Sequence, residues 1–217
     1  QIIKKINVYQ KIIDGCKLVI DNYKPSIHID KLWEFTNLGN IFENITQTIK
    51  PDNIDVRSTK YIGLEHIEKE TGLLISNFDG TFNEIKSNKN IFKKGDILYA
   101  KLRPNLNKVL LVDFDGICST DILVLRPKDF ISTGFYHSIF LSNWFNKEVL
   151  RGISGAQLPR TKFSFISEIK VPYPKKNIQD SIYEKITQEK YLVECSRKLM
   201  ELQTKKIQEE INKILEE

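Results

Sequence analysis

The stretch that decides the fold is YAKLRPNLNKVLLVDFDGICST, at residues 99–120. It begins with alternating apolar and polar residues, passes through a polar turn, and becomes apolar again from Val109. Short apolar runs that are bounded by turn-forming residues are typical of β-strands. The turn between these runs carries two Lys, one Arg and two Asn. The pattern predicts two strands that hold a basic, amide-bearing turn between them.

Working outward, the same signals predict the remaining elements of a mixed α/β region. Strands are expected at residues 60–67, 97–102, 108–113, 117–125 and 166–174. Phe114-Asp115-Gly116 is expected to join the third and fourth of these strands as a hairpin-like turn. Residues 130–150 are expected to form one or two helices, and residues 151–162 a polar loop.

Both ends of the chain have helical spacing. In the first segment the apolar residues are separated alternately by four and three positions, as in a coiled coil. They are Ile2, Ile6, Tyr9, Ile13, Cys16, Ile20 and Tyr23. In the last segment an apolar residue recurs every seven positions, which predicts a seam that faces a partner helix. That seam consists of Ile186, Val193, Met200, Ile207 and Ile214.

These signals predict an α/β (α+β) globular domain with an N-terminal helix and a long, coiled-coil-like C-terminal helix. The expected boundaries are 1–25 for the first helix, 26–175 for the globular domain and 176–217 for the long helix. At 1.5 Å per residue the last helix is roughly 60 Å long, whereas a domain of this size is about 35–40 Å across. We therefore expect it to protrude or to lie along a partner, and we expect the two helices to pack together.

Composition narrows the function classes. The net charge is +5 and the pI is about 8.9, which permits a nucleic-acid partner without requiring one. The three cysteines are far apart and form no CxxC pair, so a reducing cytoplasm is the expected setting and a zinc site is not. No apolar run is long enough to predict a membrane span. Because the chain begins with Gln1 inside a helical pattern, we expect a fragment of a longer polypeptide or an edited N-terminus.

One arrangement could carry metal-dependent chemistry. Pro51-Asp52 followed by Glu84-Ile85-Lys86 has the PD…ExK order of many nucleases, in which two carboxylates hold Mg²⁺ and the lysine orients a water molecule. The residues are common and their spacing is loose, and residues 83–90 resemble a polar loop rather than a strand. A nuclease that uses Asp52, Glu84 and Lys86 is therefore kept only as an alternative, beside a helical scaffold that does not read DNA.

Basic residues are the more informative feature. Seven Lys or Arg residues fall between Lys86 and Lys108, and a second basic group flanks the loop 151–162. Both groups are mixed with Asn, Gln, Ser and Thr. Lys and Arg neutralise phosphates, while Arg, Asn and Gln can pair with the edges of guanine or adenine. The pattern favours DNA binding, although a solvated surface with ordinary lysines would have the same composition.

Four phrases then occur together in a fixed order. They are YQKIIDGCKLVIDNYKPSIHIDKLWEFTNLG at 9–39, YIGLEHIEKETG at 61–72, KKGDILYAKLRPNLNKVLLVDFDGICSTDILVLRP at 93–127 and SGAQLPRTKFSFISEIKVPYP at 154–174. In these phrases, which cover nearly the whole chain, it resembles one half of a DNA specificity (S) subunit of a type I restriction-modification system. Similar modules are also fused to N6-adenine methyltransferases.

The resemblance implies the following function. A target recognition domain reads one half-site of a bipartite DNA sequence, and its long helix docks methyltransferase subunits. The module is not catalytic and has no cofactor, because S-adenosylmethionine is bound by the methyltransferase. Expected partners are double-stranded DNA, N6-adenine methyltransferase subunits and, through the complex, a restriction and translocase subunit. A single recognition domain departs from the whole subunit, so a second copy would have to come from dimerisation or from a missing part of the chain.

The resemblance also directs attention to the residues expected to contact DNA. The first set lies on the quoted turn and the second in the Gly-containing loop, with Gln157 and Arg160 as the expected base readers. Part of the first set could instead be structural, since Asn105 and Asn107 could satisfy backbone groups of the turn. The predicted DNA-binding residues are Lys101, Arg103, Asn105, Asn107, Lys108, Gln157, Arg160, Lys162 and, with less support, Tyr61; Glu65 is a weaker candidate still.

Overall fold

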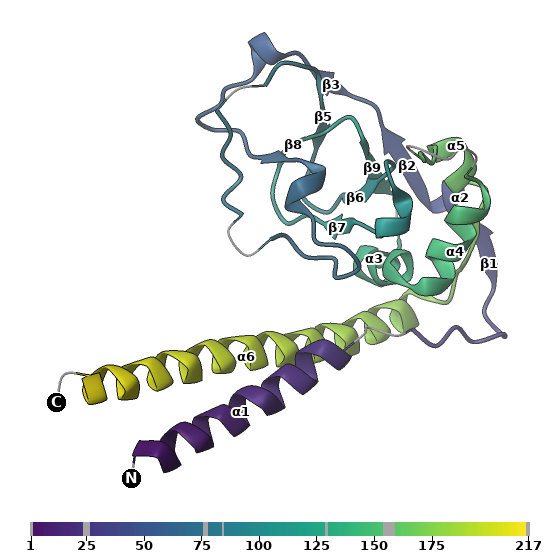
Figure 1. Ribbon diagram of the computed structural model, residues 1–217. Coiled ribbons are helices and arrows are strands. Elements are labelled where there is room, and N and C mark those ends of the chain that lie inside the picture. Colours follow the sequence, from purple (N-terminus) through teal and green to yellow (C-terminus); the bar gives the residue numbers. More distant parts are fainter. Residues whose placement is uncertain are drawn as a thin grey trace. The chain divides into compact units, whose positions relative to one another are not determined.

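The structure is a computed structural model that describes residues 2–23, 27–75, 78–83, 85–128, 130–153 and 159–215 (Figure 1). The chain divides into two compact units. The helical unit comprises Gln1–Ser26 and Glu184–Glu217, and the α/β body comprises Ile27–Tyr183. The predicted fold class, an α/β domain with an N-terminal helix and a long C-terminal helix, is confirmed.

The helical unit pairs α1 (Ile2–Asn22) with most of α6 (Lys176–Leu215), a single helix of 40 residues (Figure 1). The two helices are antiparallel. Near the start of α1, Lys5 Nζ lies 3.7 Å from Glu210 Oε1, and Lys206 Nζ lies 5.8 Å from the ring centroid of Tyr9. At the other end of α1, burial and the nearby Glu189 carboxylate raise the pKa of Tyr23 to about 12. The expectation that these two helices pack together is therefore met. No helix of the described residues is long and apolar enough to cross a membrane.

The α1 face that meets α6 follows the predicted spacing. Ile13 and Cys16 are buried, and the other residues of that face are half-buried. On α6 the seam is mixed: Ile186 is buried, and Val193, Met200 and Ile207 are half-buried. The side chain of Ile214 lies outside the described residues. The polar residues Gln203 and Glu210 are the most buried side chains in the second half of α6, at 6% and 8% exposure.

In its described residues the body contains three short sheets and four short α-helices. Its strands are β1 (Phe35–Asn37), β2 (Phe42–Ile45), β3 (Thr48–Ile49), β4 (Tyr61–Ile62), β5 (Lys89–Phe92), β6 (Ile97–Ala100), β7 (Val109–Leu111), β8 (Gly116–Cys118), β9 (Ile122–Pro127) and β10 (Lys170–Pro172). Its α-helices are α2 (Leu38–Ile41), α3 (Thr133–Leu141), α4 (Asn143–Arg151) and α5 (Phe163–Ile166). Three 3₁₀ turns are η1 (Pro51–Asn53), η2 (Leu64–His66) and η3 (Pro104–Leu106). The strand orders are β1-β10, β2-β9-β6-β7 and β3-β5-β8-β4.

The sheet β2-β9-β6-β7 has apolar side chains on both faces, which accounts for the continuous apolar runs in the sequence. One face, with Ile97, Tyr99 and Leu125, belongs to a core that includes the aromatic side chains of α3 and α4. The alternate residues Leu98 and Val124 belong to a second core with β4, β5 and β8. Successive side chains of a strand point to opposite faces, so β6 and β9 join the two cores.

An ion pair between a buried carboxylate and a half-buried guanidinium lies at one end of the sheet β2-β9-β6-β7. Asp96, 1% exposed, lies in the turn before β6. Its carboxylate accepts hydrogen bonds from Nε and Nη2 of Arg126 on β9, each at 2.8 Å, and from the Lys93 N–H at 2.7 Å. This carboxylate raises the pKa of Arg126. A two-point contact of this kind fixes the guanidinium and satisfies the buried carboxylate.

Several predicted strands are wrong in extent or pairing. The expected strand 60–67 is only β4, because Gly63 turns the chain and its N–H donates to His66 Nδ1 at 3.1 Å. The expected strand 117–125 is broken at Ser119, whose carbonyl accepts from the Ile122 N–H at 3.0 Å. The predicted hairpin is also wrong, since β7 pairs with β6 while β8 pairs with β5 and β4.

At the C-terminal side, the expected strand 166–174 is shorter than predicted. Residues 163–166 form α5, and only Lys170–Pro172 form a strand, which pairs antiparallel with β1. One or two helices were expected within 130–150, and the structure has two, α3 and α4. The hydroxyl of Tyr136 on α3 donates to the carbonyl of Pro172 at 3.0 Å, which ties this helix to β10.

Candidate nucleic-acid interface

Three segments that are distant in sequence are joined at the end of β6. Lys101 donates its N–H to the carbonyl of Asp121 at 3.0 Å and accepts at its own carbonyl from Thr161 N–H at 2.9 Å. Arg103 N–H donates to the carbonyl of Pro159 at 2.9 Å, and Leu102 forms an isolated β-bridge with Arg160. We call residues 101–103, 119–121 and 159–161 the Lys101 frame. It joins the start of the first predicted DNA-binding segment to residues 159–161 of the second.

The predicted turn is a strained reversal that starts in this frame. It is the 3₁₀ turn η3, and both flanking residues have left-handed backbone angles: φ is 49° at Arg103 and 43° at Asn107. Non-glycine residues with such angles cost free energy and persist where their surroundings impose them. Arg103 and Asn105 are exposed, whereas Pro104 is buried. The turn therefore presents Arg103 and Asn105 to solvent on a constrained backbone.

Asn107 does not fit its predicted role. Its side chain is 2% exposed, and Nδ2 donates to the carbonyl of Leu141 at 2.9 Å. Its own carbonyl accepts from the Glu70 N–H at 3.1 Å. The prediction that Asn107 is held at the surface toward DNA is wrong, because its amide links the turn to the end of α3.

The lysines of the turn are less available than their sequence positions indicate. Lys108 is half-buried, and its Nζ donates to the carbonyl of Leu64 at 2.7 Å. Lys101 is also half-buried. Lys162 is exposed at the residue before α5, beside the frame. Gln157 lies in 154–158, outside the described residues.

Arg160 has an acidic neighbour that the sequence did not reveal. Its Nε donates to Oδ1 of Asp121 at 3.2 Å, and the two side chains are 47% and 31% exposed. The two residues are 39 positions apart, so only the folded frame brings them together. A search for basic and amide residues could not find Asp121. A signal that could have found it is the carboxylate directly after Ser119 and Thr120, at a break in an apolar run.

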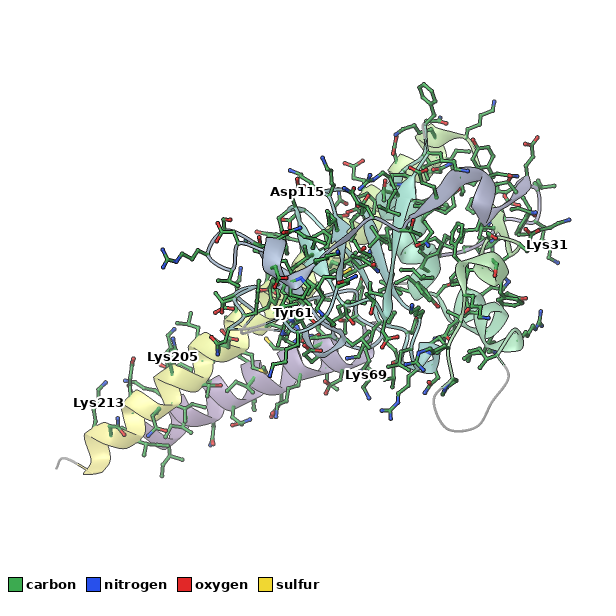
Figure 2. The ribbon with its side chains drawn as sticks, turned by 90° about the horizontal axis from the view of Figure 1, so that it is seen from above. Lys31, Tyr61, Lys69, Asp115, Lys205 and Lys213 are labelled. Carbon is green, nitrogen blue, oxygen red and sulfur yellow. The ribbon has the colours of Figure 1, made fainter. Side chains whose placement is uncertain are left out.

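Tyr61, which is labelled in Figure 2, belongs to an aromatic group of the α/β body. Its ring centroid is 5.8 Å from that of His66 and 5.9 Å from that of Phe82, and Lys89 Nζ lies 5.8 Å from the Tyr61 centroid. Burial, followed by the nearby Glu65 and Cys118, raises the pKa of Tyr61 to about 12. The residue after Tyr61 is tied to the frame, since the Ser119 N–H donates to the carbonyl of Ile62 at 3.0 Å.

The basic residues of the segment 86–108 do not form one patch. Lys93 and Lys94 are exposed in the turn that precedes β6, whereas Lys101 and Arg103 follow β6. A strand separates these two groups, so only the second lies at the frame. The sequence placed all of them in one short segment because it could not indicate which end of the strand each one occupies.

The residues of the nuclease alternative do not form a recognisable site in the described part of the chain. Asp52 is exposed in η1 and Lys86 is exposed before β5, while Glu84 lies outside the described residues. Within those residues no group of three or more His, Cys, Asp or Glu side chains could hold a metal ion. Cys118 is buried on β8, and burial raises the pKa of its thiol, which disfavours the reactive thiolate.

Comparisons with known proteins agree on one family. A family model described as the type I restriction modification DNA specificity domain matches residues 30–213. The chain is 30% identical over 156 residues to the specificity subunit of the type I restriction enzyme EcoDI from Escherichia coli, covering 72% of this chain and 34% of that protein. It is 26% identical to the HindI specificity subunit from Haemophilus influenzae, covering 71% of this chain and 34% of that protein. The chain thus spans about a third of the length of these relatives.

Solved structures share the fold. The HsdS subunit from Thermoanaerobacter tengcongensis aligns with a TM-score of 0.54 and 11% identity, covering 96% of this chain and 52% of that one. A chain from a structural study of complex assembly and conformational transition of the type I R-M system aligns with a TM-score of 0.58 and 11% identity, covering 98% of this chain and 54% of that one.

Proposed function

Because this chain belongs to the type I restriction-modification DNA specificity domain family, we propose that its α/β body binds double-stranded DNA and reads one half of a bipartite sequence. The observation that carries the proposal is the Lys101 frame. It holds the exposed Arg103 and Arg160, which come from separate segments, on one hydrogen-bonded backbone, and the exposed Asn105 lies in the turn η3 that starts from it. Arg pairs bidentately with guanine, and Asn with adenine, in the major groove.

The constrained backbone of the Lys101 frame and the turn η3 favours recognition of bases over purely electrostatic binding to phosphates. Phosphate contacts need positive charge but little precision, whereas base edges need donors at fixed positions. The left-handed turn and the Leu102–Arg160 bridge restrict the backbone before DNA arrives. Less conformational entropy is then lost on binding. Exposed Lys162 beside the frame is suited to a phosphate contact that sets the position of the body on the duplex.

In this proposal the chemical reactions are carried out by partner subunits. The chain itself is not an enzyme, and an N6-adenine methyltransferase subunit supplies S-adenosylmethionine and methyl transfer. A restriction and translocase subunit binds the same complex. The complex acts on DNA in the cytoplasm. The second half-site is read by another recognition domain, supplied either by a longer form of this chain or by a second copy.

The helical unit supports the docking part of this proposal. Apart from the seam that faces α1, α6 carries Leu192, Leu199 and Leu202 at 63%, 40% and 49% exposure. Their spacing of seven and three residues places them along one stripe of the helix. Exposed stripes of this kind mark interaction sites more often than they mark simple surfaces. A methyltransferase helix or a second copy of α6 would cover them.

Selection from a duplex library tests the proposed function. The 217-residue chain is incubated with double-stranded DNA that carries a randomised central segment, and bound duplexes are sequenced after several rounds. We expect one short sequence to be enriched, and its binding to weaken steeply with salt in proportion to the phosphates contacted. Retention of random duplexes without enrichment, or binding that does not respond to salt, would contradict the proposal. Cleavage of the library in the presence of Mg²⁺ would instead favour the nuclease alternative.

A further inference from the structure

The Lys101 frame contains one acidic residue, Asp121, in a surface that we propose binds a polyanion. A carboxylate there repels phosphates, so it weakens non-specific binding unless it has a specific task. An exposed ion pair contributes little to stability. Neither affinity for the DNA backbone nor folding therefore explains why an acidic side chain lies at this position. Its hydrogen bond with the Arg160 guanidinium provides an explanation.

The contact uses one particular edge of the guanidinium. Asp121 Oδ1 accepts from Nε of Arg160 at 3.2 Å. A guanidinium that is held through Nε can still direct Nη1 and Nη2 together toward a second pair of acceptors. Guanine offers such a pair, O6 and N7, on its major-groove edge. A phosphate can also be bound by this fork, but it does not need the guanidinium to be fixed in one orientation.

Both residues of the pair are fixed through their backbones. Asp121 accepts at its carbonyl from the Lys101 N–H, and its own N–H donates to Oγ of Ser119 at 3.2 Å. Arg160 is bridged to Leu102, and the next residue, Thr161, donates to the carbonyl of Lys101. The backbone of Lys101 and Leu102 thus fixes the positions of Asp121 and Arg160 relative to each other. The orientation of the guanidinium is set before DNA is present, which is the condition for a sharp preference between bases.

We propose that Asp121 is a positioning residue that holds the Arg160 guanidinium for two-point recognition of a single guanine in the half-site. This inference rests on the proposed function and assigns one base of the target. The carboxylate lowers affinity for DNA in general and raises the preference for that one guanine. Removing it should therefore change affinity and selectivity in opposite directions, which a simple anionic neighbour would not do.

The test uses the full 217-residue chain and the duplex that it selects, together with duplexes in which each base pair is replaced in turn. An unrelated duplex of the same length measures general affinity. We expect Arg160→Ala and Asp121→Ala each to reduce discrimination at the same G·C pair by about 5- to 150-fold. The double variant should discriminate no worse than Arg160→Ala alone, because both changes remove one interaction. Asp121→Ala should bind the unrelated duplex at least as tightly as the unchanged chain.

Further variants keep the test decisive if a substitution disturbs folding. Arg160→Lys retains the charge but lacks the fork, so it should lose the discrimination while retaining general affinity and its salt dependence. Asp121→Asn keeps an acceptor for Nε and should retain part of the discrimination. Asp113→Ala and Arg57→Ala remove exposed charges at residues outside the frame and serve as matched controls. Tryptophan fluorescence of each variant reports whether the body, which contains both tryptophans, is folded.

Two results would overturn the inference. Arg160→Ala could weaken binding to every duplex equally and flatten the salt dependence by about one charge, which is the behaviour of a phosphate contact. Alternatively, Asp121→Ala could raise affinity for all duplexes without changing their ratios. Either result leaves the proposed function intact if the unchanged chain still enriches one sequence. If it enriches none, the proposed function itself fails.

Discussion

The body and the helical unit bury their apolar residues to very different degrees. The largest fully buried side chains, which include Tyr99, Phe42 and Phe140, all belong to the body. In the helical unit the described buried apolar side chains are Ile13, Cys16 and Ile186, whereas Gln203 and Glu210 occupy interior positions. The body therefore has the cores of an independent domain, while the helical unit retains apolar surface for a partner.

The difference separates two tasks. A surface that reads bases has to be fixed before it meets DNA, and two cores that share one sheet provide that rigidity. A surface that docks a partner helix remains partly uncovered until the partner arrives. Substitutions in either unit can therefore test this division of tasks.

Replacing Asp96 with Ala should destabilise the body most. The change removes a buried carboxylate that accepts hydrogen bonds from the half-buried Arg126 guanidinium and from the Lys93 N–H, which should cost about 3 kcal/mol of unfolding free energy. Urea unfolding followed by tryptophan fluorescence measures it, since both tryptophans lie in the body. The control is Glu148→Ala, which breaks the exposed pair with Arg151 and should cost less than about 1 kcal/mol. Equal effects of the two variants would contradict a rigid, closed body.

The two asparagines of the turn should behave as opposites. Asn107→Ala removes a buried hydrogen bond to Leu141 and should cost about 1–3 kcal/mol of stability. Asn105→Ala alters an exposed side chain and should change stability by less than about 0.5 kcal/mol, while reducing preference for the selected duplex. The measurements are urea unfolding and duplex affinity on both variants. If the Asn107→Ala variant were as stable as the unchanged chain but lost base preference, Asn107 would be a DNA-contacting residue after all.

Gln203→Leu should stabilise the helical unit. The Oε1 atom of Gln203 is buried without a hydrogen-bond partner among the described residues, so an apolar side chain there should gain about 1–2 kcal/mol. Circular dichroism at 222 nm follows the loss of helix on heating, and tryptophan fluorescence should not change. The matched control is Gln188→Leu at an exposed position of α6. If Gln203→Leu lowered stability instead, a bound water molecule or a partner group would have to satisfy this amide.

The smallest effect concerns alkaline pH. The pKa of Tyr61 is raised to about 12 in the folded body, whereas an unfolded tyrosine ionises near pH 10. The stability that this difference contributes is fully present below pH 10 and is lost as pH rises through about 12. Tyr61→Phe should therefore reduce the alkaline loss of body stability, measured by urea unfolding at pH 9, 10 and 11.

The helices and the apolar strands were predictable because their signals are local. Spacing of three and four residues identified the α1 face, and apolar runs located β6, β7 and β9. The hairpin prediction failed for a physical reason. A strand that is buried on both faces carries no alternation, so its sequence does not indicate which neighbour it pairs with. β7 and β8 are adjacent in sequence but lie in different sheets.

The site was predictable only in part. Exposed basic and amide residues drew attention to Arg103 and Arg160, which the frame brings together, and to Asn105 in the adjoining turn η3. Asn107 and Asp121 were assigned wrongly or missed because their roles depend on contacts 34 and 39 residues away. Residue type identifies which side chains suit a nucleic acid, but only the fold decides which of them are exposed and which are held by another.

The most direct test of the central claim compares two double variants that lose the same charge. Arg103→Ala with Arg160→Ala removes two cations from the frame, and Lys93→Ala with Lys94→Ala removes two exposed cations before β6. The measurement is the ratio of affinities for the selected duplex and for its scrambled version. We predict that the frame variant loses at least about tenfold of this ratio, while the lysine variant weakens both affinities and keeps the ratio within about twofold. Equal ratios for the two variants would show that the body binds DNA by charge alone.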